Sequence, residues 1–357
     1  MRLYSGRTTL SKFLIEHCHT DQRELAALLI DVAAAVKAIS SVAGKGALGG
    51  GHGVVGAVNV QGEEQHGLDV LANEIFIDHC AWSGLVAGMV SEENETPIPV
   101  QGEIQRGSHL LLFDPLDGSS NIEVNVSVGT FFSVLRHEGA GQPAASDFLQ
   151  PGSKQVAAGY ALYGPCTLLV LTIGKGTHGF TLDREIGNFI LTHPNLTIEP
   201  DAREFAINIS NERFWEPPIK RYVSECKAGA TGIRARDFNM RWIASMVADV
   251  HRILTRGGVY MYPHDAKDPQ QAGRLRLLYE ANPVAFLVEQ AGGAASTGQG
   301  RIMDVQPSDL HQRVPLIFGS RHEIERIERY HEEWAAGTDK PYFSPLFVER
   351  SLLRIET

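Results

Sequence analysis

The chain has 357 residues, of which 43% are hydrophobic and 21% are charged, as expected for a globular protein of one large or two medium domains. Its 32 basic and 42 acidic side chains give a net charge of −10, which repels nucleic acid and anionic membranes at long range. We therefore expect neither a nucleic-acid nor a membrane partner. The four cysteines form no C-x-x-C pair, so neither a disulfide framework nor a zinc site is indicated.

The sequence also indicates where the protein resides. Residues 1–12 contain no apolar stretch of signal-peptide length. Residues 166–173 are taken as the most apolar run and are too short to span a bilayer. These observations predict a cytoplasmic protein.

Hydrophobic spacing predicts the elements of the first half of the chain. A helix is expected over 22–39, capped by Asp21, and a second over 69–81. The glycine-rich segment 44–56 between them predicts a mobile loop. Runs of β-forming residues predict strands over 85–90, 109–113, 126–135 and 156–171.

The pattern changes over 192–199, where His, Pro and Asn interrupt it. This change predicts an N-terminal domain over 1–195 and a C-terminal domain over 196–340. The second domain is expected to contain a helix over 240–254, a strand over 275–279 and a helix over 282–290. Because helices and strands alternate along the chain, we expect a mixed α/β fold.

An acidic motif follows the expected strand 109–113. Asp114 stands at the end of that strand, and Asp117 can turn back toward the same point if Pro115 and Gly118 bend the chain. Two carboxylates so close need either a shared proton or a divalent cation between them. Oxygen ligands favour magnesium or manganese. Taken alone, however, Asp, Pro and Gly are also common in turns that only end a strand.

Two further features extend this motif. Gly118, Ser119 and Ser120 offer consecutive backbone N–H groups and two hydroxyls, as a phosphate site requires. Glu92 and Glu93 end the strand 85–90. If that strand lies beside 109–113, four acids point into one pocket. By itself the glutamate pair is also typical of a solvated surface.

These motifs carry a resemblance to a known family. Ser-Glu-Glu at 91–93, followed by Phe-Asp-Pro-Leu-Asp-Gly-Ser-Ser-Asn-Ile at 113–122, resembles the lithium-sensitive, metal-dependent phosphatase superfamily, and the fuller pattern resembles class 1 fructose-1,6-bisphosphatase. Similar segments recur in order from about Thr9 to Ser320, at 36–41, 68–71, 158–164, 245–252 and 275–280. The resemblance implies a layered αβαβα fold with two sheets. It also implies a homotetramer that hydrolyses the 1-phosphate of fructose 1,6-bisphosphate with Mg²⁺, in gluconeogenesis or the Calvin cycle.

The resemblance assigns roles residue by residue. The implied metal ligands are Glu92, Asp114, the carbonyl of Leu116, Asp117 and Glu280. Asp69 and Glu93 match the pair that orients and deprotonates the attacking water, and Glu63 stands where a mobile loop of the family usually has Asp. The implied substrate-binding residues are Asp117, Gly118, Ser119, Ser120, Asn211, Arg241, Trp242, Tyr262 and Arg274, with Arg241 serving a neighbouring subunit.

Three of these positions depart from the family pattern. Arg274 replaces a Lys, and Trp242 and Phe214 each replace a Tyr. A guanidinium binds phosphate in a different geometry from an ammonium, and two phenolic hydroxyls are lost. Sedoheptulose 1,7-bisphosphate therefore remains open as a second or main substrate.

The regulatory positions differ as well. Residues 21–24 read Asp-Gln-Arg-Glu where AMP-inhibited relatives have Gly-Thr-Gly-Glu, and Ser108-His109 replaces a Lys-Tyr pair. An acid thus replaces an anion-binding glycine and a cation is lost, so we expect weak or absent AMP inhibition. Residues 136–151 contain no Cys, which argues against thioredoxin-type control.

Three other functions are alternatives to this interpretation. The Gly-Lys-Gly segments at 44–46 and 174–176 lack the other residues of a P-loop. Inositol-phosphate and bisphosphonucleotide phosphatases carry a Trp-Asp signature where this chain has Leu278-Tyr279-Glu280. A sugar-phosphate-binding regulator without catalysis is the remaining alternative, and acids at all the side-chain metal positions argue against it.

Overall fold

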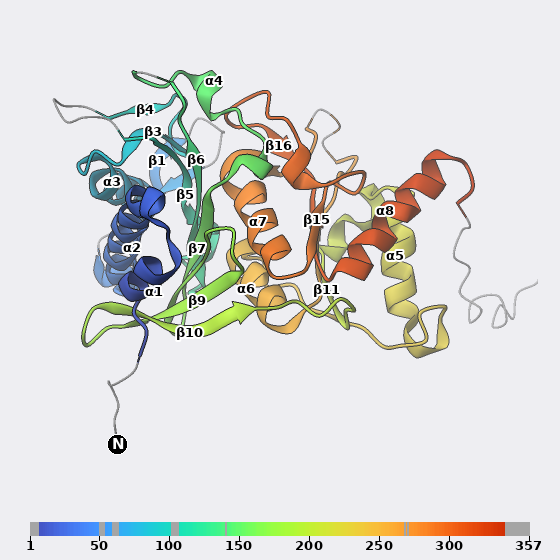
Figure 1. Cartoon of the computed structure of the whole chain (residues 1–357). Helices are drawn as coiled ribbons and strands as arrows, with labels where there is room; N and C mark the ends of the chain where they lie inside the picture. The colour runs from blue at the N-terminus through green and yellow to red at the C-terminus, as the bar shows by residue number, and fades with distance from the viewer. Residues whose placement is uncertain are drawn as a thin grey trace, which may run out of the picture.

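The computed structural model describes residues 7–49, 54–58, 64–100, 107–139, 141–267, 269 and 271–339. Helices and sheets alternate in layers from one end of the molecule to the other (Figure 1). The two large sheets have eight and five strands. The predicted mixed α/β fold is therefore confirmed.

The eight-stranded sheet holds the acidic motif. Its order is β10-β9-β8-β7-β6-β5-β3-β4, with β3 and β5 parallel and the other neighbours antiparallel. The expected strand 156–171 is split into two strands by a turn at Gly164 and Pro165. The bounds are β3 (Val86–Ser91), β4 (Ile98–Pro99), β5 (His109–Asp117), β6 (Val128–Arg136), β7 (Ala157–Tyr163), β8 (Thr167–Thr172), β9 (Thr177–Asp183) and β10 (Asn188–Leu196).

Three helices cover the outer face of this sheet: α1 (Leu10–His17), α2 (Arg23–Ala43) and α3 (Gly67–Ala81). One apolar face of α2, including Leu25, Val32 and Ile39, is fully buried in the core. Contrary to the sequence expectation, the 24-residue stretch Thr20–Ala43 has the length and hydropathy, 1.9, of a membrane-spanning helix. Half of its most apolar window is buried in this fold, as in the core helix of a globular domain.

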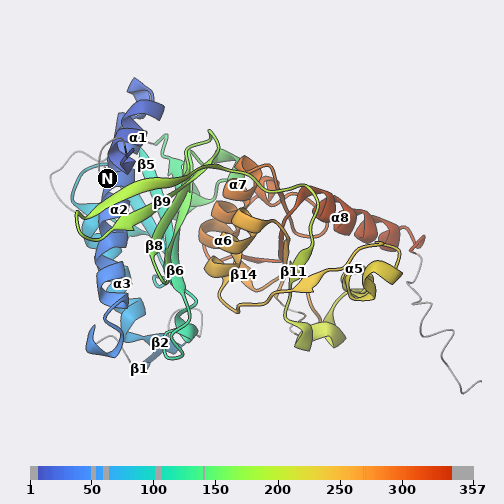
Figure 2. The same cartoon turned by 90° about the horizontal axis from the view of Figure 1, so that it is seen from below.

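The middle layer consists of α6 (Met246–Arg256) and α7 (Asn282–Gln290), which lie between the two sheets (Figure 2). Val250 and Val284 of these helices share one buried cluster with Phe131 and Tyr160 of the first sheet and Phe318 of the second. Burial of this cluster joins the two halves of the chain.

The second sheet has the order β12-β11-β13-β17-β15. Its outer face is covered by α5 (Pro217–Ala228) and α8 (Arg321–Ala335). Its strands are β11 (Glu204–Ala206), β12 (Asn239–Met240), β13 (Val259–Tyr262), β15 (Ala294–Ser296) and β17 (Leu316–Gly319).

The remaining elements are short. Two small sheets pair β1 (Val54–Val58) with β2 (Glu64–His66), and β14 (Leu275–Arg276) with β16 (Arg313–Val314). Short helices are η1 (Thr20–Gln22), η2 (Gly46–Gly49), η3 (Ser119–Asn121), α4 (Ala145–Phe148), η4 (Gly152–Lys154), η5 (Ile209–Phe214), η6 (Gly229–Thr231), η7 (Leu277–Ala281) and η8 (Ile302–Asp304). Residues 50–53 of the expected mobile loop lie outside the described residues.

Four local predictions were wrong. Asp21 lies inside η1 and Gln22 precedes α2 without a side-chain cap. The strand expected to end at Phe113 continues to Asp117, with an irregular register after Asp114. The helix expected from Met240 begins at Met246, because Ala244 has a left-handed φ of 65° that an α-helix does not allow. The strand expected over 275–279 is only two residues long and leads into the π-helix η7.

Candidate metal and phosphate site

Parallel pairing of β3 and β5 brings two acidic segments together. Ser91 lies opposite Phe113 in this pair, and the Glu92 backbone N–H donates to the Phe113 carbonyl at 3.1 Å. Glu92 and Asp114 therefore leave the same edge of the sheet side by side. The strands are neighbours, as the predicted four-acid pocket required.

A third acid, from a distant part of the sequence, lies beside Glu92 and Asp114. Glu280 lies in η7, and carboxylate oxygens of Glu92, Asp114 and Glu280 all lie within 4.8 Å of one another. The three residues are only 7%, 1% and 2% exposed. A π-helix is a rare, single-turn distortion that often occurs at functional sites, and here it carries one of the three acids.

Arg276 was missed as a site residue by the sequence reasoning. Its guanidinium lies 2.7 Å from Glu92 Oε1 and 3.4 Å from Glu280 Oε1, and its backbone N–H donates to Glu280 Oε2. The side chain is itself nearly buried, at 8% exposure. Its i,i+4 spacing from Glu280 was the available signal, although the link to Glu92 depends on the tertiary fold.

The carboxylates raise one another's pKa values. Burial, followed by the charges of Glu92, Asp117 and Glu280, raises the pKa of Asp114 well above its usual value. Burial and the charge of Glu280 raise the pKa of Asp117 to about 7. These mutual shifts show that negative charges are crowded in a buried site, and a divalent cation would neutralise them.

Asp117 lies at the end of β5, directly before residues 118–121, which form the proposed phosphate-binding turn (the phosphate turn). Its Oδ2 accepts a hydrogen bond from the Val247 backbone N–H at 2.9 Å, in the first turn of α6. Gly118 has a φ of 81°, a left-handed value that favours glycine, and it starts the turn η3. Ser119 is half-buried and Ser120 is exposed in that turn. The turn therefore presents its hydroxyls and amides next to the acids.

Asp114 also shapes the chain between the two aspartates. Its Oδ1 accepts from the Leu116 backbone N–H at 2.9 Å, while Thr130 donates to the Pro115 carbonyl at 2.8 Å. Leu116, whose carbonyl is an implied metal ligand, is buried at 4% exposure. The segment between the two aspartates is therefore held in place on both sides.

Helix α3 positions the two acids assigned to water activation. Asp69 is buried, at 3% exposure, and Asn73 lies one helical turn further along. Asn73 accepts from Ser91 Oγ at 2.7 Å and donates to Asn94 Oδ1 at 2.9 Å. The half-buried Glu93 lies in the turn held by these bonds. Asn73 was missed by the sequence reasoning, and Glu63 lies outside the described residues.

The expected sugar-phosphate residues divide into two groups. Asn211, Trp242 and Tyr262 line one small pocket together with Asp265. Arg274 lies beside this pocket, 4.0 Å from Asp265 Oδ1, and its charge partly offsets the rise in the pKa of Tyr262 that burial causes. Arg241 does not line the pocket; it is 51% exposed and lies 3.6 Å from Glu204.

The pocket and the acids are linked. Trp242 stacks on Tyr260 with ring centroids 5.7 Å apart. Charges on Asp117 and Glu280 contribute to the raised pKa of Tyr260, although burial is the main cause. Asn121 of the phosphate turn donates to the Ala244 carbonyl at 2.9 Å, two residues after Trp242. The two halves of the chain therefore meet at one site.

The donor set fits a hard divalent cation. It consists of carboxylate oxygens that are buried and close together, and Mg²⁺ and Mn²⁺ prefer such oxygen ligands. Glu92, Asp114 and Glu280 could hold such an ion. Asp117 is not part of the 4.8 Å group, but its interaction with Glu280 places it next to that group.

Both halves of the chain match the sequences of known proteins. The family models for the N-terminal and C-terminal domains of fructose-1,6-bisphosphatase match residues 8–194 and 198–332. A class 1 fructose-1,6-bisphosphatase of Methylibium petroleiphilum is 57% identical over 351 residues, covering 97% of this chain and 98% of the relative. One from Hydrogenophilus thermoluteolus is 56% identical over 354 residues, covering 98% of each.

Solved structures agree with these sequence matches. The holo form of Leishmania major fructose-1,6-bisphosphatase has a TM-score of 0.85 and 39% identity, covering 92% of this chain and 99% of the other. The apo form has a TM-score of 0.81 and 37% identity, covering 92% and 100%. From the two matching domain models and the near-complete coverage, we conclude that the chain belongs to the fructose-1,6-bisphosphatase family.

Proposed function

We propose that the protein hydrolyses the 1-phosphate of fructose 1,6-bisphosphate to fructose 6-phosphate and phosphate, with Mg²⁺ as cofactor and Mn²⁺ as a possible substitute. The proposal rests on the family and on one observation in particular. Three buried carboxylates from separate segments, Glu92, Asp114 and Glu280, meet within 4.8 Å, next to a turn of amides and hydroxyls.

Each group then has a chemical task. When bound, the metal ion would neutralise the phosphate and make a water molecule more acidic. Glu92, Asp114, Glu280, Asp117 and the carbonyl of Leu116 would hold it. The amides and hydroxyls of Ser119 and Ser120 would bind the phosphate oxygens and orient phosphorus for in-line attack. Asp69 and Glu93 would orient the attacking water and accept its proton.

The second phosphate would bind in the pocket of the second half of the chain. Asn211, Tyr262 and Arg274 supply an amide, a phenol and a guanidinium there. Because Arg241 is half exposed and does not line this pocket, we propose that it serves the site of a neighbouring subunit in a homotetramer.

Exposed apolar side chains support an oligomer. Leu48, Val124 and Ile186 are 94%, 68% and 48% exposed. They come from segments that adjoin a hollow of about 690 Å³ lined by residues including Asn125 and Arg184. Light scattering would test the oligomeric state. Mixing Arg241→Ala subunits with Asp114→Asn subunits should restore activity only if Arg241 acts between subunits.

Substrate choice needs a direct assay. Phosphate release from fructose 1,6-bisphosphate and from sedoheptulose 1,7-bisphosphate should be compared, each with and without Mg²⁺. Sedoheptulose 1,7-bisphosphate remains a candidate because Trp242, in place of a phenol, forms part of the pocket wall. The absence of Mg²⁺-dependent release from both compounds would refute the proposed hydrolase.

Weak AMP inhibition and a cytoplasmic location remain proposals. Asp21 replaces the first glycine of the Gly-Thr-Gly-Glu segment of AMP-inhibited relatives, and Ser108-His109 replaces their Lys-Tyr pair, so an acid is gained and a cation is lost where those relatives bind a nucleotide phosphate. We expect little inhibition in an AMP titration, and strong inhibition by micromolar AMP would contradict this expectation. Cell fractionation would test the location.

A further inference from the structure

Residues 241–244 form a loop that joins β12 to α6 and carries two of the proposed phosphate-site residues. Trp242 faces the small pocket, while Arg241 and Ile243 are 51% and 37% exposed. Ala244 has a φ of 65°, a left-handed value that is strained for a residue other than glycine. Such a loop keeps one conformation only if its surroundings hold it.

Four hydrogen bonds hold this loop. The Arg241 N–H donates to the Phe205 carbonyl at 2.8 Å, and the Ala244 carbonyl accepts from Asn121 at 2.9 Å. The other two come from one pair of α6 side chains. Asp249 Oδ2 accepts from the Ile243 N–H at 3.2 Å, and Arg252 Nη2 donates to the Arg241 carbonyl at 3.3 Å.

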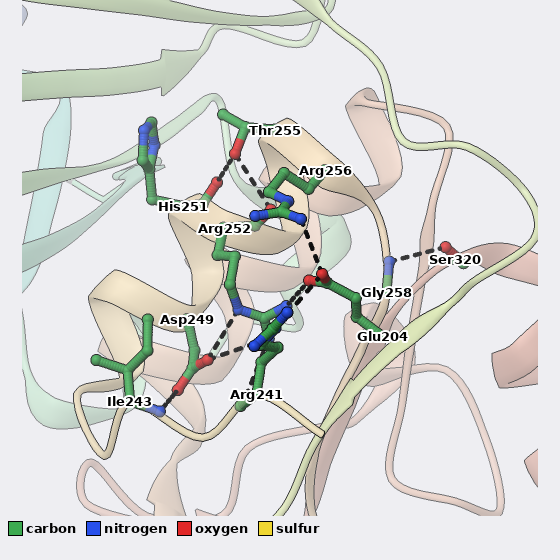
Figure 3. Close-up of polar contacts among 10 residues, drawn as sticks. All are labelled: Glu204, Arg241, Ile243, Asp249, His251, Arg252, Thr255, Arg256, Gly258 and Ser320. Atoms are coloured by element: carbon green, nitrogen blue, oxygen red, sulfur yellow. Dashed lines mark hydrogen bonds and ion pairs between the residues drawn. The ribbon is translucent and has the colours of Figure 1, made fainter. Parts of the chain in front are cut away.

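Arg252 is the centre of a larger charged network (Figure 3). It lies 3.2 Å from Asp249 Oδ1 and 2.8 Å from Glu204 Oε2. Its side chain is 11% exposed, whereas that of Asp249 is fully buried. A guanidinium suits this place because its planar fork can donate to two carboxylates and a carbonyl at once, which a lysine cannot do in the same geometry.

Glu204 is shared by three arginines. It lies 2.8 Å from Arg252, 2.9 Å from Arg256 and 3.6 Å from Arg241. Arg252 makes the shortest of these contacts and is the least exposed of the three arginines, so Glu204 stays paired with it when either of the others is removed. Because Arg241 has the longest contact and is half exposed, it can leave Glu204 for an anion while Glu204 stays paired.

We propose that Arg252 is a positioning residue for binding of the sugar phosphate. Through its bond to the Arg241 carbonyl, it holds the loop that carries Arg241 and places Trp242 in the pocket. This inference rests on the proposed sugar bisphosphatase function. Arg252 acts through the loop, and no contact with the substrate or the metal is assigned to it.

The test compares Arg252→Ala and Arg252→Lys with a matched control, Arg256→Ala, which removes a 63% exposed arginine from the same glutamate. We expect Arg252→Ala to raise the KM for fructose 1,6-bisphosphate and the dissociation constant for fructose 6-phosphate about tenfold or more, the size of one lost charged hydrogen bond. kcat and the Mg²⁺ concentration for half activation should change less than about threefold. Arg252→Lys should restore part of the affinity, and the control should keep the wild-type KM.

Three outcomes would overturn the inference. The first is a wild-type KM in Arg252→Ala. The second is an equal rise in KM in Arg256→Ala. The third is a loss of kcat and Mg²⁺ response without a loss of fructose 6-phosphate binding. If Arg252→Ala does not fold, Arg252→Lys provides the test. A wild-type KM in Arg252→Lys would show that the forked guanidinium is not needed and would overturn the inference. Failure of the proposed function itself would be seen separately, as an inactive wild-type enzyme.

Discussion

The substitution Asp114→Asn should have opposite effects on stability and on activity. Asp114 is 1% exposed, and its carboxylate lies within 4.8 Å of those of Glu92 and Glu280. Two full charges at that separation repel by about 3 kcal/mol at an effective dielectric constant of about 20. Asparagine has nearly the same shape and keeps an oxygen for the Leu116 N–H, so it removes the repulsion with little change in packing.

The net gain must be smaller than this repulsion. Burial and the neighbouring acids raise the pKa of Asp114, so part of the repulsion is already relieved by protonation, and Arg276 compensates another part. We expect Asp114→Asn to raise the free energy of unfolding of the metal-free protein by about 1–2 kcal/mol at neutral pH. A folded-state pKa above the unfolded value means that the wild type loses stability as pH rises between the two values. The advantage of the variant should therefore grow with pH over that window.

Metal and activity should respond in the other direction. Mg²⁺ should raise the melting temperature of the wild type, whereas Asp114→Asn should show little rise and at least a hundredfold lower kcat. Urea unfolding gives the free energy of unfolding, thermal unfolding with and without Mg²⁺ gives the melting temperatures, and phosphate release gives kcat. Asp78→Asn, at an exposed acid of α3, is the matched control and should resemble the wild type. A variant that is less stable without metal, or that keeps the full Mg²⁺ response, would refute the reasoning.

Three other substitutions test separate parts of the site and fold. Asp117→Asn keeps an acceptor for the Val247 N–H but removes a charge beside the metal site, so kcat should fall at least tenfold; unchanged turnover would point to a different site. Gly118→Ala should lower the urea midpoint by the equivalent of about 1 kcal/mol, because the φ of 81° disfavours alanine. A clash would not add to this loss, since the new Cβ would meet its nearest neighbours at an ordinary contact distance of 3.5 Å. An unchanged midpoint would contradict the strain argument. Burial, with a smaller effect of His193, lowers the pKa of His251 to about 4 in the folded protein. The unfolded chain, with a histidine pKa of about 6.5, binds the proton more readily, so stability should fall as the pH drops from about 6.5 to 4. The loss from this group should be about 1–2 kcal/mol at pH 5, and a His251→Gln variant should show a flatter pH dependence of the urea midpoint; an equally steep profile would exclude His251 as the cause.

Local patterns were sufficient for several elements. The helix that begins near residue 22, the helix that ends at Ala81 and the helix over 282–290 follow from the spacing of apolar side chains and from Pro and Gly at the helix ends. The acidic motif and the phosphate turn were also predictable, because their residues are contiguous. The resemblance to the family then supplied Glu280, which no local pattern joins to Asp114.

Sequence by itself thus determined the mixed α/β class, most of the elements and the chemical types at the site, since these depend on short-range periodicity and residue chemistry. Only the tertiary structure decided that β3 and β5 are parallel neighbours, that η7 brings Glu280 and Arg276 to Glu92, and that Arg252 holds the loop before α6. Local signals also failed at Ala244 and Leu277, where long-range contacts impose a backbone that neither helix nor strand propensity predicts. The physical reason is that pairing across a sheet and burial of charge depend on groups far apart in the chain, whose meeting is settled by packing of the whole fold.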